Sequence, residues 1–471
     1  MNVVMIALDA VRADHLSCYG YPRSTSPRLD ALAAGGVLFE RHFTPITGTM
    51  PAMTTVFSGT HPLTHLILNQ DASSGLNPKI TWLSLLMRHH GIDAVAVDDL
   101  VDHRTWFARG YRYYLNPRRR GERTTAANVN DLAIEWIETG RDAPFFMHMH
   151  YPDAHAPYMP ADDRMGLFYD ADPTTTNVGS LDEFYRRPTG ENWPKQWFGD
   201  LLQRWPSTSG QRIEDIDFIA AQYDAQVRAV DDAVGVLCDA LERVGRLDDT
   251  LLIVYGNHGE QLGEHGVYFD AHGLHDASLH VPLILHWPSG LKGGRRVQAL
   301  TQHQDLAATV VEAVGESLRE DLIEGRSMLP LARGETTMSH WNHKLIACES
   351  TWQAAWALRT SEYKLIVSRE CDYRSSPPVV LFDLLDDPGE TRNIAAENPN
   401  LTKKLLDIFD GALRQMLAGR GHKSDPIVPG AVTLGRRLFQ AQGHRYPPRP
   451  STWNPHPPPR LEPVPKVTSR V

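Results

Sequence analysis

Two uninterrupted apolar runs constrain the fold of this chain more than any other feature. Residues 2–8 form the first run, which stops at Asp9, and residues 251–256 form the second, which stops at Asn257 and His258. Short β-branched runs of this kind are typical of strands buried on both faces of a parallel sheet. Ligands of open α/β sheets collect beyond the carboxyl ends of such strands. The runs predict one site built from both regions, unless Asp9 and Asn257 only form turns.

Strand and helix signals alternate through the first 350 residues. The residue pattern favours helices at 27–34, 81–90 and 126–139, and one or two helices at 214–244. Strands are expected at 92–97, 144–150 and 282–286. This alternation predicts an α/β fold with a mostly parallel central sheet sandwiched by helices.

Changes in composition divide the 471-residue chain further. Residues 1–350 are expected to form the catalytic α/β domain, and its irregular segment 160–212 either covers the substrate or is a structural spacer. Residues 351–423 are expected to form a smaller α+β subdomain. Residues 424–471 are rich in proline, so we expect an extended arm, either free or laid across a neighbouring surface.

Charge and cysteine content exclude several classes of protein. The formal net charge of −10 argues against a nucleic-acid surface. The basic cluster at residues 118–123 is interpreted as a solvated loop, with an anion contact as the alternative. The four cysteines are far apart, which indicates neither a disulfide framework nor a zinc cluster. Neither a signal core nor a membrane-length apolar run is present, so a cytoplasmic protein with no membrane partner is expected.

The segment from Thr49 to Gly59 predicts a helix. Thr49 has N-cap chemistry, Pro51 fits the first turn, and Gly59 fits a C-terminal stop. The free N–H groups at the start of such a helix favour an anion. The alternative is that Thr49 is only a cap.

Seven segments, in order along residues 2–415, resemble enzymes of the sulfatase family in the alkaline phosphatase superfamily. They are residues 9–21, 59–65, 150–158, 257–266, 303–310, 358–366 and 381–393. The resemblance implies that Thr49 is the nucleophile, because it stands where sulfatases carry the Cys or Ser that becomes formylglycine. Thr cannot be converted in that way, so the chain is identified with the threonine-nucleophile branch, in which the hydroxyl attacks phosphorus.

The resemblance also implies a metal site formed by four residues: Asp9, Thr49, Asn257 and His258. Asn257 and Ala10 stand where many members carry Asp, and Met53 stands where the usual Arg is found. A site with one certain carboxylate binds magnesium or calcium more weakly, and its imidazole favours zinc or manganese. The metal therefore remains zinc, manganese, magnesium or calcium.

The remaining candidate residues surround the expected ester. His155 is expected to protonate the leaving group, and His272 to contact the oxyanion. Asp153 is expected to bind substrate, orient His155 or hold a second metal, while Arg12 either reaches the anion or braces the turn. His150 is interpreted as a core or supporting histidine, and His65, His265 and His303 as structural. The Gly-Lys-x-His segment that many members of the family use is absent, and Asp98 and Asp99 stand near its expected place, so the pocket is expected to be less cationic.

These features predict a metal-dependent hydrolase of phosphate or phosphonate esters that acts on a small anionic molecule. One alternative is a sulfate-ester hydrolase or a phosphoryl transferase of the same superfamily. The other is a non-catalytic binding protein with a degenerate metal site. A homo-oligomer formed through the proline-rich tail is also a possibility that the sequence leaves open.

Overall fold

The structure is a computed structural model, and it describes residues 1–70, 75–139, 143–186, 194–206, 208–317, 321–372, 374–427 and 450–461. Its central sheet has the strand order β12-β2-β11-β7-β1-β6-β4-β5. In that order the strands are Arg295–Val297, Val37–Phe39, Leu283–His286, Thr250–Gly256, Asn2–Leu8, Phe145–Tyr151, Asp93–Val97 and Tyr113–Leu115. Strand β11 is antiparallel to both of its neighbours, while the other pairings are parallel. The predicted mostly parallel sheet is confirmed.

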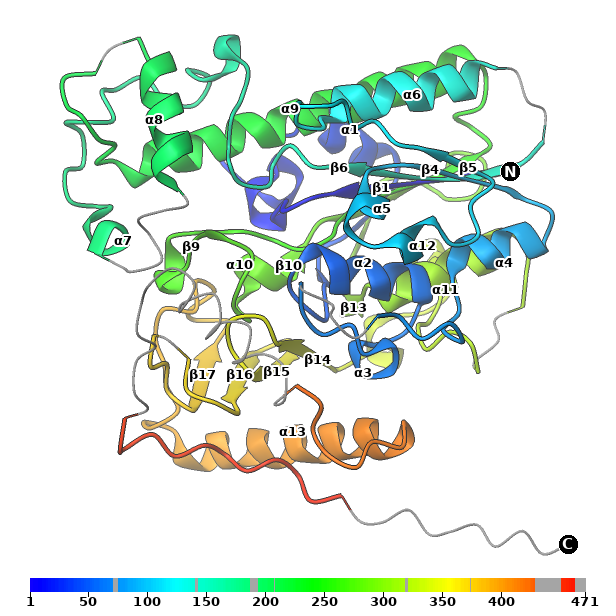
Figure 1. The fold of residues 1–471 in the computed structure, drawn as a ribbon. Helices are drawn as coiled ribbons and strands as arrows, with labels where there is room; N and C mark the ends of the chain where they lie inside the picture. The colour runs from blue at the N-terminus through cyan, green and yellow to red at the C-terminus, as the bar shows by residue number, and fades with distance from the viewer. Residues whose placement is uncertain are drawn as a thin grey trace, which may run out of the picture.

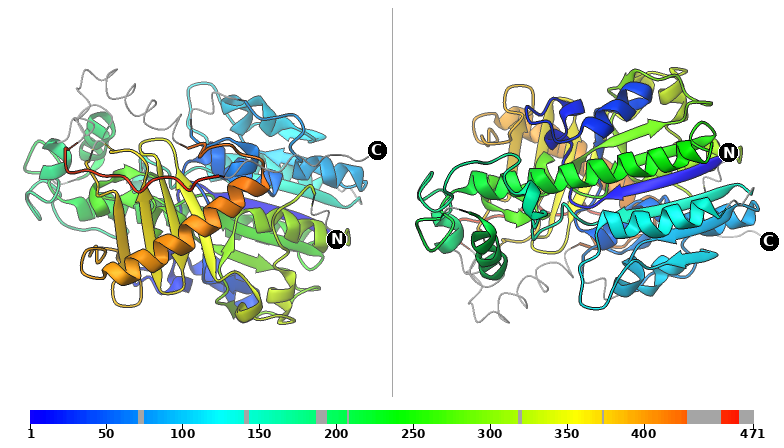
Figure 2. Two further views of the ribbon diagram at one scale, coloured as in Figure 1. Left: turned by 90° about the horizontal axis from the view of Figure 1, so that it is seen from below. Right: turned by 90° about the horizontal axis from the view of Figure 1, so that it is seen from above.

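Helices cover both faces of this sheet (Figures 1 and 2). One face carries α1 (Pro27–Gly35), α6 (Ala126–Glu138) and α9 (Ile216–Arg243), and the other carries α2 (Thr49–Ser58), α4 (Leu83–His89), α11 (Gln304–Ala313) and α12 (Leu329–Arg333). Strand β1 is buried on both faces because its side chains alternate between the two cores. Val4, Ile6 and Leu8 pack into the first core, and Val3, Met5 and Ala7 into the second. Burying each large side chain in this way contributes roughly 1.5–3 kcal/mol to the free energy of folding.

The predicted elements agree with the structure to within a few residues, with two differences. The pattern at 214–244 forms one helix, α9. Helix α2 begins at Thr49, but Gly48 is its N-cap and no side chain caps it, so the prediction that Thr49 caps the helix is wrong. Gly48 has φ +87°, and the Met50 N–H is satisfied by Gln70 instead. The hydroxyl of Thr49 is therefore free to face another part of the molecule.

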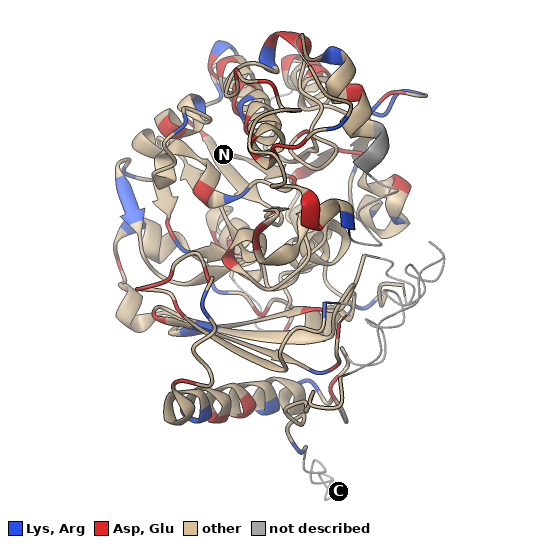
Figure 3. Cartoon of the chain, turned by 90° about the vertical axis from the view of Figure 1, so that its left-hand side faces the viewer, with Lys and Arg blue, Asp and Glu red and all other residues tan. Residues whose placement is uncertain are grey.

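The C-terminal unit is an antiparallel sheet backed by one helix. Its strands are β14 (Lys344–Glu349), β15 (Ala355–Thr360), β16 (Tyr363–Ser368) and β17 (Val379–Asp383). Helix α13 (Pro399–Gly419) buries Leu405, Phe409, Leu413 and Leu417 against this unit. Lys, Arg, Asp and Glu residues of α13 lie on the side of the helix that faces away from the sheet (Figure 3). The sheet begins at Lys344, slightly before the expected boundary at residue 351.

The segment 160–212 contains more regular structure than its sequence pattern suggests. It includes the short helices α7 (Asp182–Arg186) and α8 (Pro194–Arg204). Tyr169 and Trp205 pack edge-to-face on Phe218 of α9, with ring centroids 5.2 and 5.1 Å away, respectively. Part of this segment thus anchors to the helical layer. Its role as a substrate cover stays a prediction.

The described part of the tail lies on the chain's own C-terminal unit. Trp453 is 6% exposed and donates to the carbonyl of Ser376, while His456 lies 2.8 Å from Asp410 of α13. The rest of the predicted arm, residues 428–449 and 462–471, lies outside the described residues. Within the described part of the chain, no helix combines the length and apolar character needed to cross a membrane.

Candidate active site

Strand register brings the predicted site residues to one edge of the sheet. Leu8, the last residue of β1, pairs with Tyr151 of β6 on one side and with Gly256 of β7 on the other. Asp9, Pro152 and Asn257 directly follow these three paired residues, so they lie side by side at the same edge of the sheet. Helix α2 is separate in sequence but presents Thr49 to the same edge. The sequence prediction that these residues meet is matched by the geometry.

Three functional atoms form a compact triangle at this edge. The Thr49 hydroxyl lies 3.1 Å from Nε2 of His258 and 3.4 Å from Oδ1 of Asp9. Nε2 of His258 lies 3.3 Å from the same carboxylate oxygen. Nδ1 of His258 is 2.9 Å from the carbonyl of Gly259, which can only accept, so Nδ1 carries the proton. The lone pair of Nε2 consequently faces the Thr49 hydroxyl.

Burial and neighbouring histidines set the charges of this triangle. Burial opposes ionisation of Asp9, but His150, His155 and His258 outweigh it and hold the pKa of Asp9 well below its usual range. Burial lowers the pKa of His258, although Asp9 opposes the shift. A carboxylate thus stands beside a neutral imidazole, which can accept a proton or ligate a metal.

Asn257 contacts Asp9 through its amide nitrogen rather than its oxygen. Its Oδ1 accepts from the backbone N–H groups of Ala10, at 3.1 Å, and His258, at 2.7 Å. These donors fix the amide orientation, and Nδ2 donates to Oδ1 of Asp9 at 2.7 Å. Ala10 reaches this position with φ +60°, an uncommon conformation for alanine. In this geometry the side-chain oxygen of Asn257 is already used.

The donors present fit a divalent metal only in part. Asp9, Thr49 and His258 supply a carboxylate, a hydroxyl and an imidazole, a set closer to zinc than to calcium or magnesium. Asn257 would have to release its backbone donors before its oxygen could bind. Within the described residues, no three His, Cys, Asp or Glu side chains form a metal-holding group.

His150 lies closer to the site than a supporting histidine was expected to lie. It is fully buried, and its Nε2 is 3.4 Å from Oδ2 of Asp9. Burial alone would lower the pKa of His150, but Asp9, Asp99 and Asp98 outweigh burial and raise it. Asp98 directly follows β4 and also contacts His148, at 3.2 Å. Alternation along β6 could have signalled that His148 and His150 share one face of the strand.

His155 and Asp153 lie on the loop that follows β6. The imidazole ring of His155 has its centroid 6.1 Å from that of His258, and its Nδ1 is 2.8 Å from the carbonyl of Ala156. Its Nε2 is then available to a leaving group. Asp153 accepts from the N–H of Ala126 at 2.7 Å, so its carboxylate holds the first residue of α6. This contact favours a positioning role for Asp153.

Arg123 holds the His155 loop, a role that sequence reasoning missed. Its guanidinium donates to the carbonyl of His155, at 2.5 Å, and to that of Pro152, at 3.2 Å. It also donates to the carbonyl of Pro157, at 2.5 Å. Residues 118–123 are exposed, so the solvated-loop interpretation is confirmed, but the contacts of Arg123 with the His155 loop are revealed only by the three-dimensional path of the chain.

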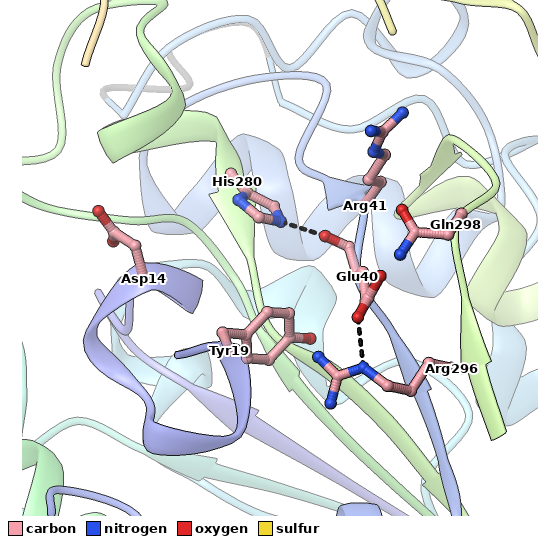
Figure 4. Close-up of a pocket in the computed structure, with 7 residues that line it drawn as sticks. All are labelled: Asp14, Tyr19, Glu40, Arg41, His280, Arg296 and Gln298. Carbon is pink, nitrogen blue, oxygen red and sulfur yellow. Dashed lines mark hydrogen bonds and ion pairs between the residues drawn. The ribbon is translucent and has the colours of Figure 1, made fainter. Parts of the chain in front are cut away.

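The guanidinium of Arg12 is bound by two acidic side chains. Its guanidinium forms ion pairs with Asp14, at 2.7 Å, and with Glu264, at 2.6 Å. The geometry favours the bracing alternative for Arg12. Asp14 lines a separate hollow of about 250 Å³, whose other walls include Tyr19, Glu40, Arg41, His280, Arg296 and Gln298 (Figure 4). In that hollow Arg296 pairs with Glu40.

The other histidines occupy distinct surroundings. Nδ1 of His272 lies beside the carboxylate of Asp270, and the His272 ring lies 5.4 Å from that of Trp352. His65 and His303 bond to Thr55 and to the carbonyl of Gly256, each at 3.0 Å. His265 stacks on His275 at 3.6 Å, so these contacts are structural in character.

Comparisons with known proteins identify the relatives of this chain. The family model described as Sulfatase matches residues 1–316, and the model described as N-sulphoglucosamine sulphohydrolase, C-terminal, matches residues 263–415. An N-acetylglucosamine-6-O-sulfatase from Bacteroides thetaiotaomicron is 23% identical, with 88% of this chain and 86% of that protein covered. Human arylsulfatase K is 30% identical, with 86% and 80% covered.

Solved structures agree on the fold. A protein in complex with its substrate D-glucosamine-2-N,6-O-disulfate superposes with a TM-score of 0.73 at 20% identity, covering 91% of this chain and 99% of that one. A phosphonate monoester hydrolase from Agrobacterium radiobacter has a TM-score of 0.68 at 22% identity, covering 89% and 95%. The relatives favour the sulfate-ester alternative over the predicted phosphate ester. The chain belongs to the sulfatase family of the alkaline phosphatase superfamily and is a hydrolase of sulfuric or phosphoric ester bonds.

Proposed function

We propose that this enzyme hydrolyses sulfate esters of small organic molecules and that Thr49 is its attacking group. The observation that carries the proposal is the contact between the Thr49 hydroxyl and Nε2 of His258, at 3.1 Å, next to the ionised Asp9. A hydroxyl facing an imidazole lone pair can transfer its proton as it attacks.

The charge of the site supports a substrate with a single negative charge. Asp9 contributes a negative charge, His258 is neutral, and Asp99 lies near enough to His150 to affect its pKa. The nearby guanidiniums of Arg12 and Arg123 are bound to acids and to loop carbonyls. Since a sulfate monoester carries one charge and a phosphate monoester close to two, the site fits the sulfate ester better.

Each residue of the site has a separate role in the proposed reaction. Thr49 attacks, His258 accepts its proton, and Asn257 holds Asp9 in place through the 2.7 Å hydrogen bond. His155, held by Arg123, is placed to protonate the departing oxygen. A divalent metal held by Asp9, His258 and Thr49 would lower the pKa of the hydroxyl and neutralise the ester oxygens. Water must then open the ester formed on Thr49.

A phosphonate monoester is the second candidate, and Thr49 itself is the observation that favours it. The threonine hydroxyl cannot form the geminal diol through which formylglycine releases sulfate. Displacement at phosphorus is well supported for hydroxyl nucleophiles. A phosphonate monoester also carries a single charge, so the charge argument does not separate the two.

Paired aryl esters test the proposal. We expect 4-nitrophenyl sulfate to be hydrolysed faster than 4-nitrophenyl phosphate, and Thr49→Ala to abolish both activities. Measuring 4-nitrophenyl phenylphosphonate in parallel decides between the two candidates. Faster hydrolysis of the phosphate than of both monoanionic esters would overturn the charge argument. Equal rates for wild type and Thr49→Ala would remove Thr49 from the mechanism.

A further inference from the structure

A cavity of about 660 Å³ lies between α6 and α9, on the helical layer of the main domain. This volume is within the range of small-molecule sites, roughly 300–1,000 Å³. Its walls are mostly apolar and include Ala127 and Ile134 of α6, Ala229 and Val236 of α9, and Met159. Val236 remains 50% exposed, so an apolar ligand would cover surface that water now contacts.

The floor of this cavity carries a buried amide without a partner. Gln226 of α9 is 6% exposed, lines the cavity, and has no hydrogen-bond partner among the described residues. A buried amide left unpaired costs about 1–3 kcal/mol, so such groups normally bind a ligand or ordered water. Asp153 shares the floor at 9% exposure, and its Oδ2 is used by Ala126.

Acceptors outnumber free cations around the cavity. Asp131, Asp153 and Asp232 line it, together with Arg123 and Arg164. Arg164 pairs with Asp232 at 2.7 Å, and Arg123 donates to the carbonyls of the His155 loop. Asp131 is exposed and has no ion-pair partner among the described residues. Once Arg164 and Asp232 are paired, the two carboxylates of Asp131 and Asp153 outnumber the single guanidinium of Arg123, and a cationic donor complements this excess of acids.

We propose that this cavity binds a small primary amine with an apolar body. The ammonium group donates to the amide oxygen of Gln226 and to the carboxylates of Asp131 and Asp153. The apolar body packs between the alanine, isoleucine and valine side chains of α6 and α9. The cavity does not include the Asp9–Thr49–His258 triangle, although it shares Arg123 and Asp153 with the loop that carries His155.

Calorimetric titration of the full chain with hexylamine, hexanol and hexanoate tests this proposal. We expect hexylamine to bind and hexanoate not to bind, because only the amine complements the acceptors. Asp131→Asn should weaken hexylamine binding about tenfold, as expected for the loss of a charged hydrogen bond. Ala127→Trp should fill the cavity and abolish binding.

Two controls make the outcome specific. Glu135→Gln removes an exposed acid from the next turn of α6 outside the cavity, and it should leave hexylamine affinity unchanged. Thr49→Ala should also leave it unchanged, because the catalytic triangle is not part of the site. Failure of hexylamine to bind, equal binding of hexanoate, or equal affinity in wild type and Asp131→Asn would each overturn the proposal, whatever the esterase assays show.

Discussion

Replacing Asn257 by Asp should make the stability of this enzyme depend on metal. In the wild type, Nδ2 of Asn257 donates to Asp9 at 2.7 Å, while its oxygen accepts two backbone N–H groups. An aspartate in the same position keeps the two backbone bonds but turns a carboxylate oxygen towards Asp9. Both residues are buried, at 0% and 5% exposure, so water screens the new repulsion weakly.

The structure gives the size of this effect. Losing a hydrogen bond to a charged acceptor costs about 1.5–3 kcal/mol. Two like charges about 4 Å apart repel by about 4 kcal/mol at an effective dielectric of 20. A repulsion of this size raises the pKa of one carboxylate by roughly 3 units, at about 1.4 kcal/mol per unit, so both carboxylates stay largely ionised at pH 8. We therefore expect Asn257→Asp to lose about 5–7 kcal/mol of unfolding free energy at pH 8 in the presence of a chelator.

Urea unfolding followed by intrinsic fluorescence measures the loss, in chelator and in separate calcium, manganese and zinc solutions. A metal between the two carboxylates should recover most of the stability and bind more tightly than in wild type. Asn130→Asp is the matched control, since Asn130 is a buried amide that donates to the carbonyl of Ala233 rather than to Asp9. It should be destabilised without any response to metal. An Asn257→Asp variant as stable as wild type in chelator would refute the contact between Asn257 and Asp9.

Three further predictions address the catalytic groups and the pH dependence of stability. Thr49→Ala should lower turnover by about 10³-fold or more, measured in single-turnover assays, and should change unfolding free energy little because Thr49 caps no helix. His155→Gln should slow alkyl esters, whose leaving groups need a proton, by about 10²-fold more than nitrophenyl esters. Burial raises the pKa of Asp231 to about 6, so the native state binds this proton more tightly than the unfolded state does. The free energy of unfolding should therefore fall as the pH rises from about 4 to about 6. Asp231→Asn should flatten this slope in urea titrations.

The central architecture could be predicted from the sequence because short local patterns indicate its strands. The run before Asp9 and the run before Asn257 are short and apolar, and such runs have few places other than the middle of a parallel sheet. Once both are strands, parallel register brings the residues after them together. The meeting of Asp9, Asn257 and His258 follows from these local signals and needs no knowledge of side-chain packing.

Other parts of the site depend on contacts that no local pattern encodes. The orientation of Asn257 is fixed by backbone donors, one of which is Ala10 at φ +60°. Arg123 donates to the carbonyl of His155, 32 residues further along the chain, whereas the local sequence suggested a solvated loop or an anion contact. The cap of α2 was misassigned by one residue because glycine and threonine are both acceptable N-caps, and the positive φ of Gly48 decided between them.

The departures of this chain from the common sulfatase pattern compensate one another. By resemblance to the family, Ala10 and Asn257 stand where negative charge is expected and Met53 stands where positive charge is expected, while Asp98 and Asp99 add negative charge near the site. Removing only the acids would leave the site too cationic to release a sulfate product, and removing only the bases would repel the substrate. With both removed, the single carboxylate of Asp9 is held by a neutral amide and faces a neutral imidazole and a hydroxyl. If Thr49 attacks as proposed, such a site is expected to depend less on metal charge and more on the nucleophilicity of Thr49, so one amide-to-carboxylate change is expected to increase metal dependence.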